Sequence, residues 1–213
     1  MSYRKQLFTY TNISKIITIH YIYCLFHGKL EGSGLELIGL LMKEHRLIEK
    51  IGTPIETELK YILHQNKVHT SFIYDAIDFF RTYVDRFHHG KEENILFLEL
   101  KKKELEPMHH QILTELEEEH KIARRTVEKI YIDIDRWRNG DNQALTSISV
   151  NLKKLIELYP GHIEKEDKHF FFPCQNYFTR EEREKILQAG YNFNQEFTYI
   201  NYKDRINTLL EYK

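Results

Sequence analysis

The 213-residue chain is poor in the residues that several large classes of protein require. Its two cysteines, Cys24 and Cys174, are too few for a disulfide scaffold or for a cysteine-rich zinc or iron–sulfur site. Nine glycines and four prolines are few for a β-sandwich, and no GxGxxG, GxxxxGKS or GxxxxGKT motif occurs. Because the formal net charge is −1, we expect neither nucleic acid nor a membrane surface among its partners.

Histidine, in contrast, is abundant, with 12 residues. Hydrophobic residues make up 41% of the chain and charged residues 30%, as in a folded globular protein with a sizeable core. A chain rich in histidine and poor in cysteine is expected to use imidazole and carboxylate chemistry. Two cysteines are most simply free thiols in a reducing compartment, so we predict a cytoplasmic protein.

Residues 1–34 differ from the rest in being rich in tyrosine, isoleucine and threonine. Their apolar run from Ile16 to Phe26 is shorter than the roughly 20 residues that cross a bilayer. Arg4 and Lys5 precede this run, but no A-x-A-like cleavage site follows, which disfavours a signal peptide. We expect a strand-like or disordered leader, or a segment that results from a misplaced start.

From Leu35 onward the apolar residues recur with a helical period. Four long amphipathic segments with short connections predict an all-α fold, an antiparallel up-and-down four-helix bundle over residues 35–175. In region 176–213, a short helix from Thr179, with Glu182 completing a capping box, is expected to end at Gly190, and this region is expected to pack on or near the bundle. The four segments cover about residues 35–64 (with a break at Pro54), 68–104, 107–140 and 142–172.

An internal two-fold repeat is the most informative pattern in the sequence. Glu44-His45 in the first segment matches Glu119-His120 in the third, and HHGKEE at 88–93 matches HIEKED at 162–167. The offsets are 75 residues from His45 to His120 and 74 residues from His88 to His162. A helix pair that is repeated once would place two similar halves around a pseudo-two-fold axis.

Helical geometry predicts which residues of the second segment face the core. At 100° per residue and with Val84 as the reference, His88 lies at about 40° and Glu92 at about 80°. His89 and Glu93 lie at about 140° and 180° on the same scale. The period therefore predicts that His88 and Glu92 point inward and that His89 and Glu93 form an outward, solvated pair.

The other three segments also carry polar residues on their apolar faces. His162 and Glu166 lie within about 60° of Tyr159, and His45 and His120 lie about 40° from leucines of their own segments. Burying two carboxylates and four imidazoles without partners would cost several kcal/mol each. Metal ions remove this cost, because neutral imidazoles and ionised carboxylates are natural ligands. We predict a dinuclear metal site with the ligands His45, His88, Glu92, His120, His162 and Glu166.

This pattern resembles the hemerythrin-like (HHE cation-binding) family, whose members bind non-haem di-iron in a four-helix bundle. The residues that carry the resemblance are LMKEHRLIE at 41–49, HHGKEE at 88–93 with Leu96-Phe97, Glu119-His120, and HIEKED at 162–167 with Phe172-Pro173. The resemblance implies two oxo- or hydroxo-bridged iron ions as the cofactor. It makes Glu92 and Glu166 the bridging carboxylates and the four histidines the terminal ligands. The implied partner is a small diatomic ligand or peroxide, with no protein partner specified.

The oxygen-carrying members of that family differ from this chain at two positions. They have a second histidine one turn after the third-helix ligand, where this chain has Arg124. They also have an aspartate five residues after the fourth-helix histidine, a place that Asp167 would fill only if Glu166 were not the ligand. The resemblance is therefore closer to the four-histidine, two-glutamate members. Fewer protein nitrogens leave more positions for O2, NO or peroxide, which favours reactivity or sensing over reversible transport.

Other interpretations stay open. A ferritin-like centre fits the spacing of Glu117 with His120 and of Glu166 with His169, but it leaves the remaining histidines unexplained. A di-iron oxidoreductase, or a protein that repairs iron–sulfur clusters under nitrosative stress, would share the ligand set, although the leader does not match the cysteine-bearing domain usual in such repair proteins. A helical interaction module with a structural ion is the third alternative.

Smaller assignments concern residues near the predicted site. Glu44 and Glu119 either orient imidazoles by accepting N–H hydrogen bonds or belong to a solvated face. The eight other histidines are expected to be dispensable for the chemistry. Cys174 follows the site helix and is either a simple free thiol or redox-active.

Overall fold

The computed structural model describes residues 36–196 and 208–211, and all regular secondary structure in these residues is helical. The predictions for the leader, for Cys24 and for residues 197–207 lie outside the described residues. Among the helices in the described part, none combines the length and the apolar character needed to cross a membrane.

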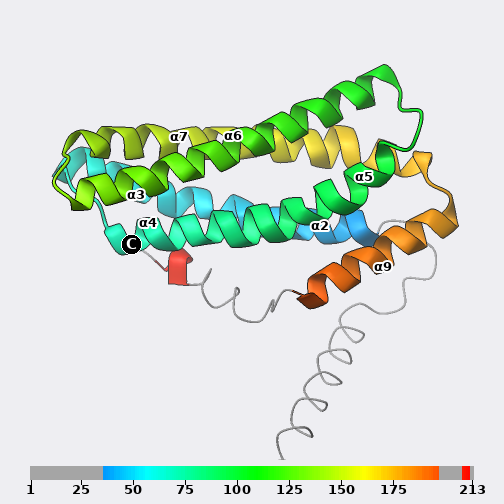
Figure 1. Ribbon diagram of the computed structural model, residues 1–213, viewed down its shortest axis with the longest axis horizontal. Coiled ribbons are helices and arrows are strands. Elements are labelled where there is room, and N and C mark those ends of the chain that lie inside the picture. The colour runs from blue at the N-terminus through cyan, green and yellow to red at the C-terminus, as the bar shows by residue number, and fades with distance from the viewer. Residues whose placement is uncertain (1–35, 197–207, 212–213) are drawn as a thin grey trace, which may run out of the picture. The chain divides into compact units, whose positions relative to one another are not determined.

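Long helical segments lie side by side in a bundle, with α6 packed along α7 and α3 also against α7 (Figure 1). The first segment consists of α2 (Glu36–Ile48), the 3-10 turn η1 (Glu49–Ile51) and α3 (Gly52–Gln65). The second consists of α4 (Thr70–Asp78), the π-helical η2 (Phe79–His89) and η3 (Glu92–Leu96), and α5 (Phe97–Leu100). The third is α6 (Pro107–Arg138), and the fourth consists of α7 (Gln143–Glu164), the π-helical η4 (Lys165–Phe170) and α8 (Phe171–Cys174). The 3-10 turn η5 (Gln175–Tyr177) leads to α9 (Arg180–Glu196).

Helix boundaries follow the local sequence. The first segment is interrupted at η1, three residues before the predicted break at Pro54, and Pro54 itself lies in the first turn of α3. α6 begins at Pro107, which has no N–H to leave unpaired, after an extended Glu106 with φ −58° and ψ 148°. The chain leaves α6 through Gly140, whose φ of 92° lies in the left-handed region that glycine tolerates. The predicted limits of the third segment are thus confirmed.

The capping box of α9 is also present, but this helix is longer than predicted. Glu182 Oε2 accepts a hydrogen bond from the Thr179 amide at 2.8 Å, and Thr179 Oγ1 accepts one from the Glu182 amide at 3.3 Å. The predicted end at Gly190 is wrong, because α9 continues to Glu196. A Cβ atom on Gly190 would lie 2.6 Å from Leu37 Cδ1, so this glycine permits close packing of α9 on α2 instead of ending the helix.

Two apolar clusters fill the interior, and a polar layer separates them. One cluster includes most of the buried side chains of α3, α4, η2 and α7, together with Leu209. The other includes those of the first half of α2, of α5, α8 and α9. Each segment passes from one cluster to the other at the same level, between Leu41 and Ile48, Phe87 and Ile95, Leu116 and Ala123, and Ile163 and Phe170.

The π-helical stretches change which residues of the second segment are buried. Groups of buried residues begin there at 79, 83 and 87, four residues apart, and the third group continues without a break to Glu92, so that it includes His89. In an α-helix this spacing would drift by about 40° per repeat. A π-helix joins residues five apart, so each residue turns through a smaller angle and the buried face stays aligned. The prediction that His89 faces solvent is therefore wrong, because this residue is 1% exposed, and Glu93 is half-buried.

Candidate metal centre

The six predicted ligand residues come from all four segments and meet in the polar layer between the two clusters. The four imidazoles are at most 4% exposed and the two carboxylates are fully buried. These residues are His45 of α2, His88 of η2, Glu92 of η3, His120 of α6, His162 of α7 and Glu166 of η4.

The Glu92 carboxylate lies between imidazoles of both halves of the repeat. Its Oε1 atom is 3.2 Å from His88 Nε2 and 3.8 Å from His45 Nε2. Its Oε2 atom is 3.5 Å from His120 Nε2. One carboxylate therefore faces a histidine pair from the first half and a histidine from the second.

The Glu166 carboxylate lies in a similar position from the opposite half. Its Oε2 atom is 3.1 Å from His45 Nε2 and 3.3 Å from His162 Nε2. Its Oε1 atom is 3.9 Å from His120 Nε2. Both carboxylates thus face imidazoles of both halves.

Buried polar atoms without partners provide a test of whether this cluster fits a metal. None of the four carboxylate oxygens of Glu92 and Glu166 has a hydrogen-bond partner, and neither does His45 Nε2. Leaving charged groups unsatisfied in the interior is costly, and a bound cation would remove that cost. Donor atoms of His45, His88, Glu92 and Glu166 all lie within 4.8 Å of one another. The cluster therefore fits a metal ion.

A carboxylate fixes the orientation of each imidazole. Because a carboxylate only accepts, each Nδ1–H donates, and each Nε2 lone pair is directed toward the centre. Glu44 and Glu119 thus orient imidazoles, each on a neighbouring helix, and a solvated role for them is excluded. Neither Glu93 nor Asp167 had been predicted to do so. The Nδ1 distances are 2.7 Å from His45 to Asp167, 2.9 Å from His88 to Glu44, 2.7 Å from His120 to Glu93 and 2.8 Å from His162 to Glu119.

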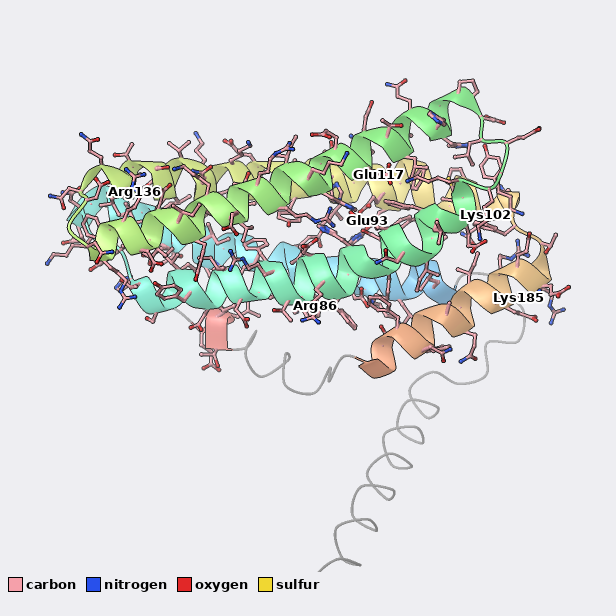
Figure 2. All side chains as sticks on the ribbon, viewed as in Figure 1. Arg86, Glu93, Lys102, Glu117, Arg136 and Lys185 are labelled. Atoms are coloured by element: carbon pink, nitrogen blue, oxygen red, sulfur yellow. The ribbon has the colours of Figure 1, made fainter. Side chains whose placement is uncertain are left out.

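The four carboxylates that orient the imidazoles (the outer carboxylates) also form ion pairs with lysine or arginine side chains. Figure 2 shows Glu93 between the helices, whereas Arg86 and Lys185 project away from the bundle. Each outer carboxylate thus contacts a cation as well as an imidazole. The ion pairs are Lys91 with Glu44, Arg124 with Glu93, Lys165 with Glu119, and Arg46 with Asp167.

Contacts in one half recur in the other at the offset of the sequence repeat. The Phe97 ring stacks on His120 with centroids 6.0 Å apart, and the Phe171 ring stacks on His45 with centroids 5.7 Å apart. The pairs Glu44–His88 and Glu119–His162 are related in the same way. The two halves therefore repeat their contacts as well as their motifs.

Burial and hydrogen bonding act in opposite directions on the pKa values of these imidazoles. Burial alone would lower the pKa of His45, but the hydrogen bond to Asp167 and the nearby carboxylates of Glu166 and Glu92 raise it to about 12. The pKa of His88 is raised because Glu92 and Glu44 outweigh burial. Burial raises the pKa of Glu92, but its imidazole neighbours hold it well below the usual value. Without a metal, a proton on His45 therefore balances part of the carboxylate charge.

A family model of the hemerythrin HHE cation-binding domain matches residues 36–172, more than half of the chain. The chain belongs to this family. Comparisons with curated proteins and with solved structures give no significant match. The part that matches the hemerythrin HHE domain includes all six predicted ligand residues and ends before α9 begins.

The ferritin-like alternative places its residues elsewhere in this HHE domain. The Glu117 side chain is 29% exposed and pairs with Lys101, and His169 is exposed. Neither residue reaches the buried cluster. Cys174 is a buried free thiol whose pKa burial raises to about 12, which argues against a reactive thiolate at neutral pH.

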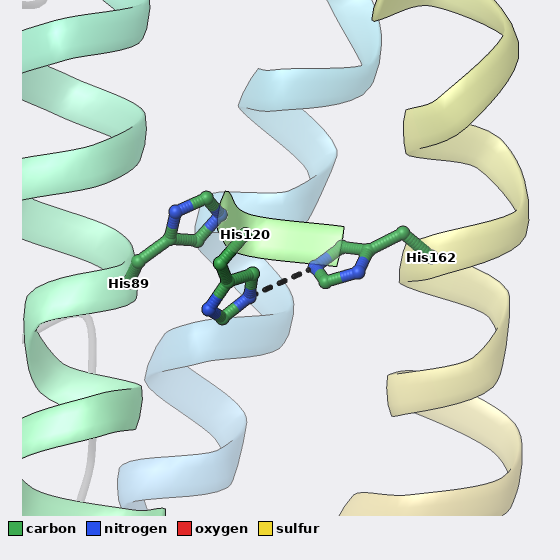
Figure 3. Close-up of side chains that lie close together, drawn as sticks. All are labelled: His89, His120 and His162. Carbon is green, nitrogen blue, oxygen red and sulfur yellow. Dashed lines mark hydrogen bonds between the residues drawn. The ribbon is translucent and has the colours of Figure 1, made fainter. Parts of the chain in front are cut away.

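His89 is the residue of the centre that sequence reasoning missed. Its ring stacks on His120 with centroids 3.8 Å apart, and Figure 3 shows it beside His120 and across from His162. Burial and nearby imidazoles lower the pKa of His89. Its burial follows from the π-helical η2, which a constant rotation of 100° per residue does not predict.

Proposed function

We propose that this protein is a non-haem di-iron protein that binds or senses O2, NO or peroxide. Its ligands are His45, His88, Glu92, His120, His162 and Glu166. The observation that carries the proposal is the placement of Glu92 and Glu166. Each carboxylate lies between imidazoles of both halves, and none of its oxygens has a hydrogen-bond partner.

The donor set supports iron as the metal. Imidazole and carboxylate together suit iron, and sites with few protein donors leave positions open to small exogenous ligands. Iron in such a site would supply redox chemistry and a coordination position for a diatomic ligand or peroxide. Four imidazoles shared by two ions favour sensing or reactivity over reversible transport. The proposal includes an antiparallel four-helix topology with an internal two-fold repeat, which the recurring contacts support.

The protein's own residues prepare the site for this chemistry. Glu44, Glu93, Glu119 and Asp167 hold the proton on each Nδ1 atom, so that each Nε2 atom is free to bind metal. Phe97 and Phe171 cover two of the imidazoles and exclude water from that side. The proposed compartment is the cytoplasm, which the free thiol of Cys174 supports.

Reconstitution with Fe(II) under anaerobic conditions tests the proposal. We expect about two irons per chain, and ligand-to-metal absorption bands on exposure to air or NO. His88→Ala and His162→Ala should each lower the iron content. His110→Ala and His169→Ala are the matched controls, since both residues are exposed, and both variants should keep two irons. Wild-type protein without iron, or unchanged iron content in the first two variants, would contradict the proposal.

A further inference from the structure

His89 breaks the two-fold repeat at the centre of the molecule. At the 74-residue offset that relates the two HxxxE motifs, the second half has Ile163, a buried apolar residue. His89 has an imidazole at the equivalent place, and neither of its ring nitrogens has a hydrogen-bond partner. A histidine that only filled space in the core would be expected to satisfy at least one nitrogen. This polar group therefore needs a partner that the protein itself does not supply.

The surroundings of His89 leave one nitrogen available to the centre. Its Nδ1 atom is 3.5 Å from Asp85 Oδ1, and Arg124 holds that carboxylate through an Nε hydrogen bond of 2.6 Å. The two nitrogens of an imidazole point in different directions, so Nε2 is directed away from Asp85. His45, His88, His120 and His162 have the same arrangement, with Nδ1 toward a carboxylate and Nε2 toward the centre.

A second cluster of possible donors lies on this side of the centre. One ring nitrogen each from His89, His120 and His162 lies within 4.8 Å of the others. The His120 and His162 Nε2 atoms are 3.2 Å apart, a separation that a single metal ion can span (Figure 3). His89 lies beside that point, because its ring stacks on His120 with centroids 3.8 Å apart.

We propose that His89 is a fifth nitrogen ligand, bound to the metal position that His120 and His162 define. This inference rests on the proposed di-iron function. It makes the two positions unequal, with His45 and His88 at one metal and three imidazoles at the other. The position with two imidazoles then has more room for an exogenous ligand, and the position with three is the more strongly held.

His89→Ile tests this assignment, because it introduces the residue that the second half already has at this place. Iron-loaded wild-type protein should give two unequal iron environments in its Mössbauer spectrum. We expect the variant to make these environments more alike and to lose one of its two irons to a chelator at least about 10-fold faster. His110→Ala is the control and should behave as the wild type.

The outcomes separate this inference from the di-iron function. Wild-type protein that binds fewer than two irons overturns both, whereas two irons with unchanged spectra and unchanged iron loss in His89→Ile overturn the fifth ligand alone. The fifth-ligand assignment is also overturned if His89→Ile retains both irons as firmly as the wild type and only binds NO more weakly. If the variant does not fold, pulsed EPR of the mixed-valent wild type counts the coupled imidazoles: five support the assignment and four overturn it.

Discussion

Lys91 and Lys165 occupy equivalent places in the two halves of the centre, yet only Lys165 reaches solvent. Each donates to the carboxylate behind a histidine, Lys91 to Glu44 and Lys165 to Glu119. The Lys91 side chain is fully buried, whereas that of Lys165 is 24% exposed. The two ion pairs are alike in their partners and differ in their access to water.

The cause of this difference is α9, which has no counterpart in the other half. Asn194 of α9 accepts a hydrogen bond from Lys91 Nζ at 3.1 Å. A Cβ atom on Gly90 would lie 2.8 Å from the Phe193 ring, so α9 approaches η2 closely. Burial lowers the pKa of Lys91, while Glu44 and the Phe87 ring, 3.5 Å from Nζ, stabilise its charge. A repeated motif therefore provides similar side chains, and a helix outside the repeat makes their surroundings unequal.

Removing Glu92 or Glu166, which we propose to be shared by two irons, should affect both halves at once. We expect Glu92→Gln and Glu166→Gln each to lower iron affinity by more than about 100-fold, because ligand loss should exceed the effect of losing an outer partner. Both irons should be lost together, as measured by iron content after dialysis against a chelator. Glu164→Gln is an exposed control on the same segment as Glu166. Loss of only one iron would show that the carboxylate serves one position.

Removing the equivalent lysines should lower the free energy of unfolding by different amounts in the two halves. Lys91→Met leaves the mostly buried Glu44 without its cation, and we expect it to lower the free energy of unfolding by about 3 kcal/mol. Lys165→Met should cost about 1 kcal/mol or less, since solvent screens that pair. Urea denaturation of the apo proteins measures both. Equal effects would mean that α9 does not bury Lys91 in solution.

The outer carboxylates should have matched effects in the two halves. Glu93→Gln and Asp167→Asn each remove the negative charge of the acceptor that holds an imidazole, His120 in one case and His45 in the other. We expect iron affinity to fall by about 10- to 100-fold in both variants, as measured by competition with a chelator. Glu117→Gln on α6 is the control and should leave affinity unchanged. An effect in only one variant would reveal a difference that the repeat does not predict.

Iron affinity should rise with pH in both halves. The pKa of His45 is raised to about 12 and the pKa values of His88 and His162 are raised above the usual value, so protons compete with a metal for these imidazoles. The stabilising effect of these protons is lost as pH rises, and iron must displace them. We expect affinity to change by about tenfold per pH unit for each proton released. Calorimetry in two buffers of different ionisation enthalpy counts these protons, and a count of zero would contradict the assignment.

Loosening α9 should make the two halves more alike. Phe193→Ala removes the ring that packs on Gly90, and we expect it to lower the free energy of unfolding by about 1–2 kcal/mol. Amide hydrogen exchange should increase in α9, α2 and η3 and stay unchanged in α7. An exposed substitution on α9, Glu184→Gln, should leave exchange as in the wild type. A uniform increase across the bundle would indicate general destabilisation.

Much of this arrangement follows from local patterns. Pro107 and Gly140 mark the limits of the third helical segment because their backbone preferences act within a few residues. The sequence repeat predicts six site residues, and in the structure all six lie in one buried layer. The repeated pairs are His45 and His120, His88 and His162, and Glu92 and Glu166. Such predictions work because helical periodicity requires no knowledge of distant contacts.

Features that depend on a change of helix type or on contacts between helices could not be predicted from the helical period alone. A rotation of 100° per residue, as in an α-helix, places His89 on the solvated face. The helix is π-helical at this point, so His89 is buried instead. Asp167 was considered only as an alternative ligand, although it orients His45, a residue 122 positions away in the chain. Contacts of that kind depend on how helices pack, which the period of one segment does not encode.

Residue types and their spacing are enough to predict that the chain is helical and that a repeated set of histidines and glutamates lies on apolar faces, because periodicity and the cost of burial act locally. The packing of the helices determines which carboxylate orients which imidazole. It also places Lys91 under α9 and stacks His89 on His120. These features arise between residues far apart in the chain, where packing and the width of the helical turns determine which atoms meet.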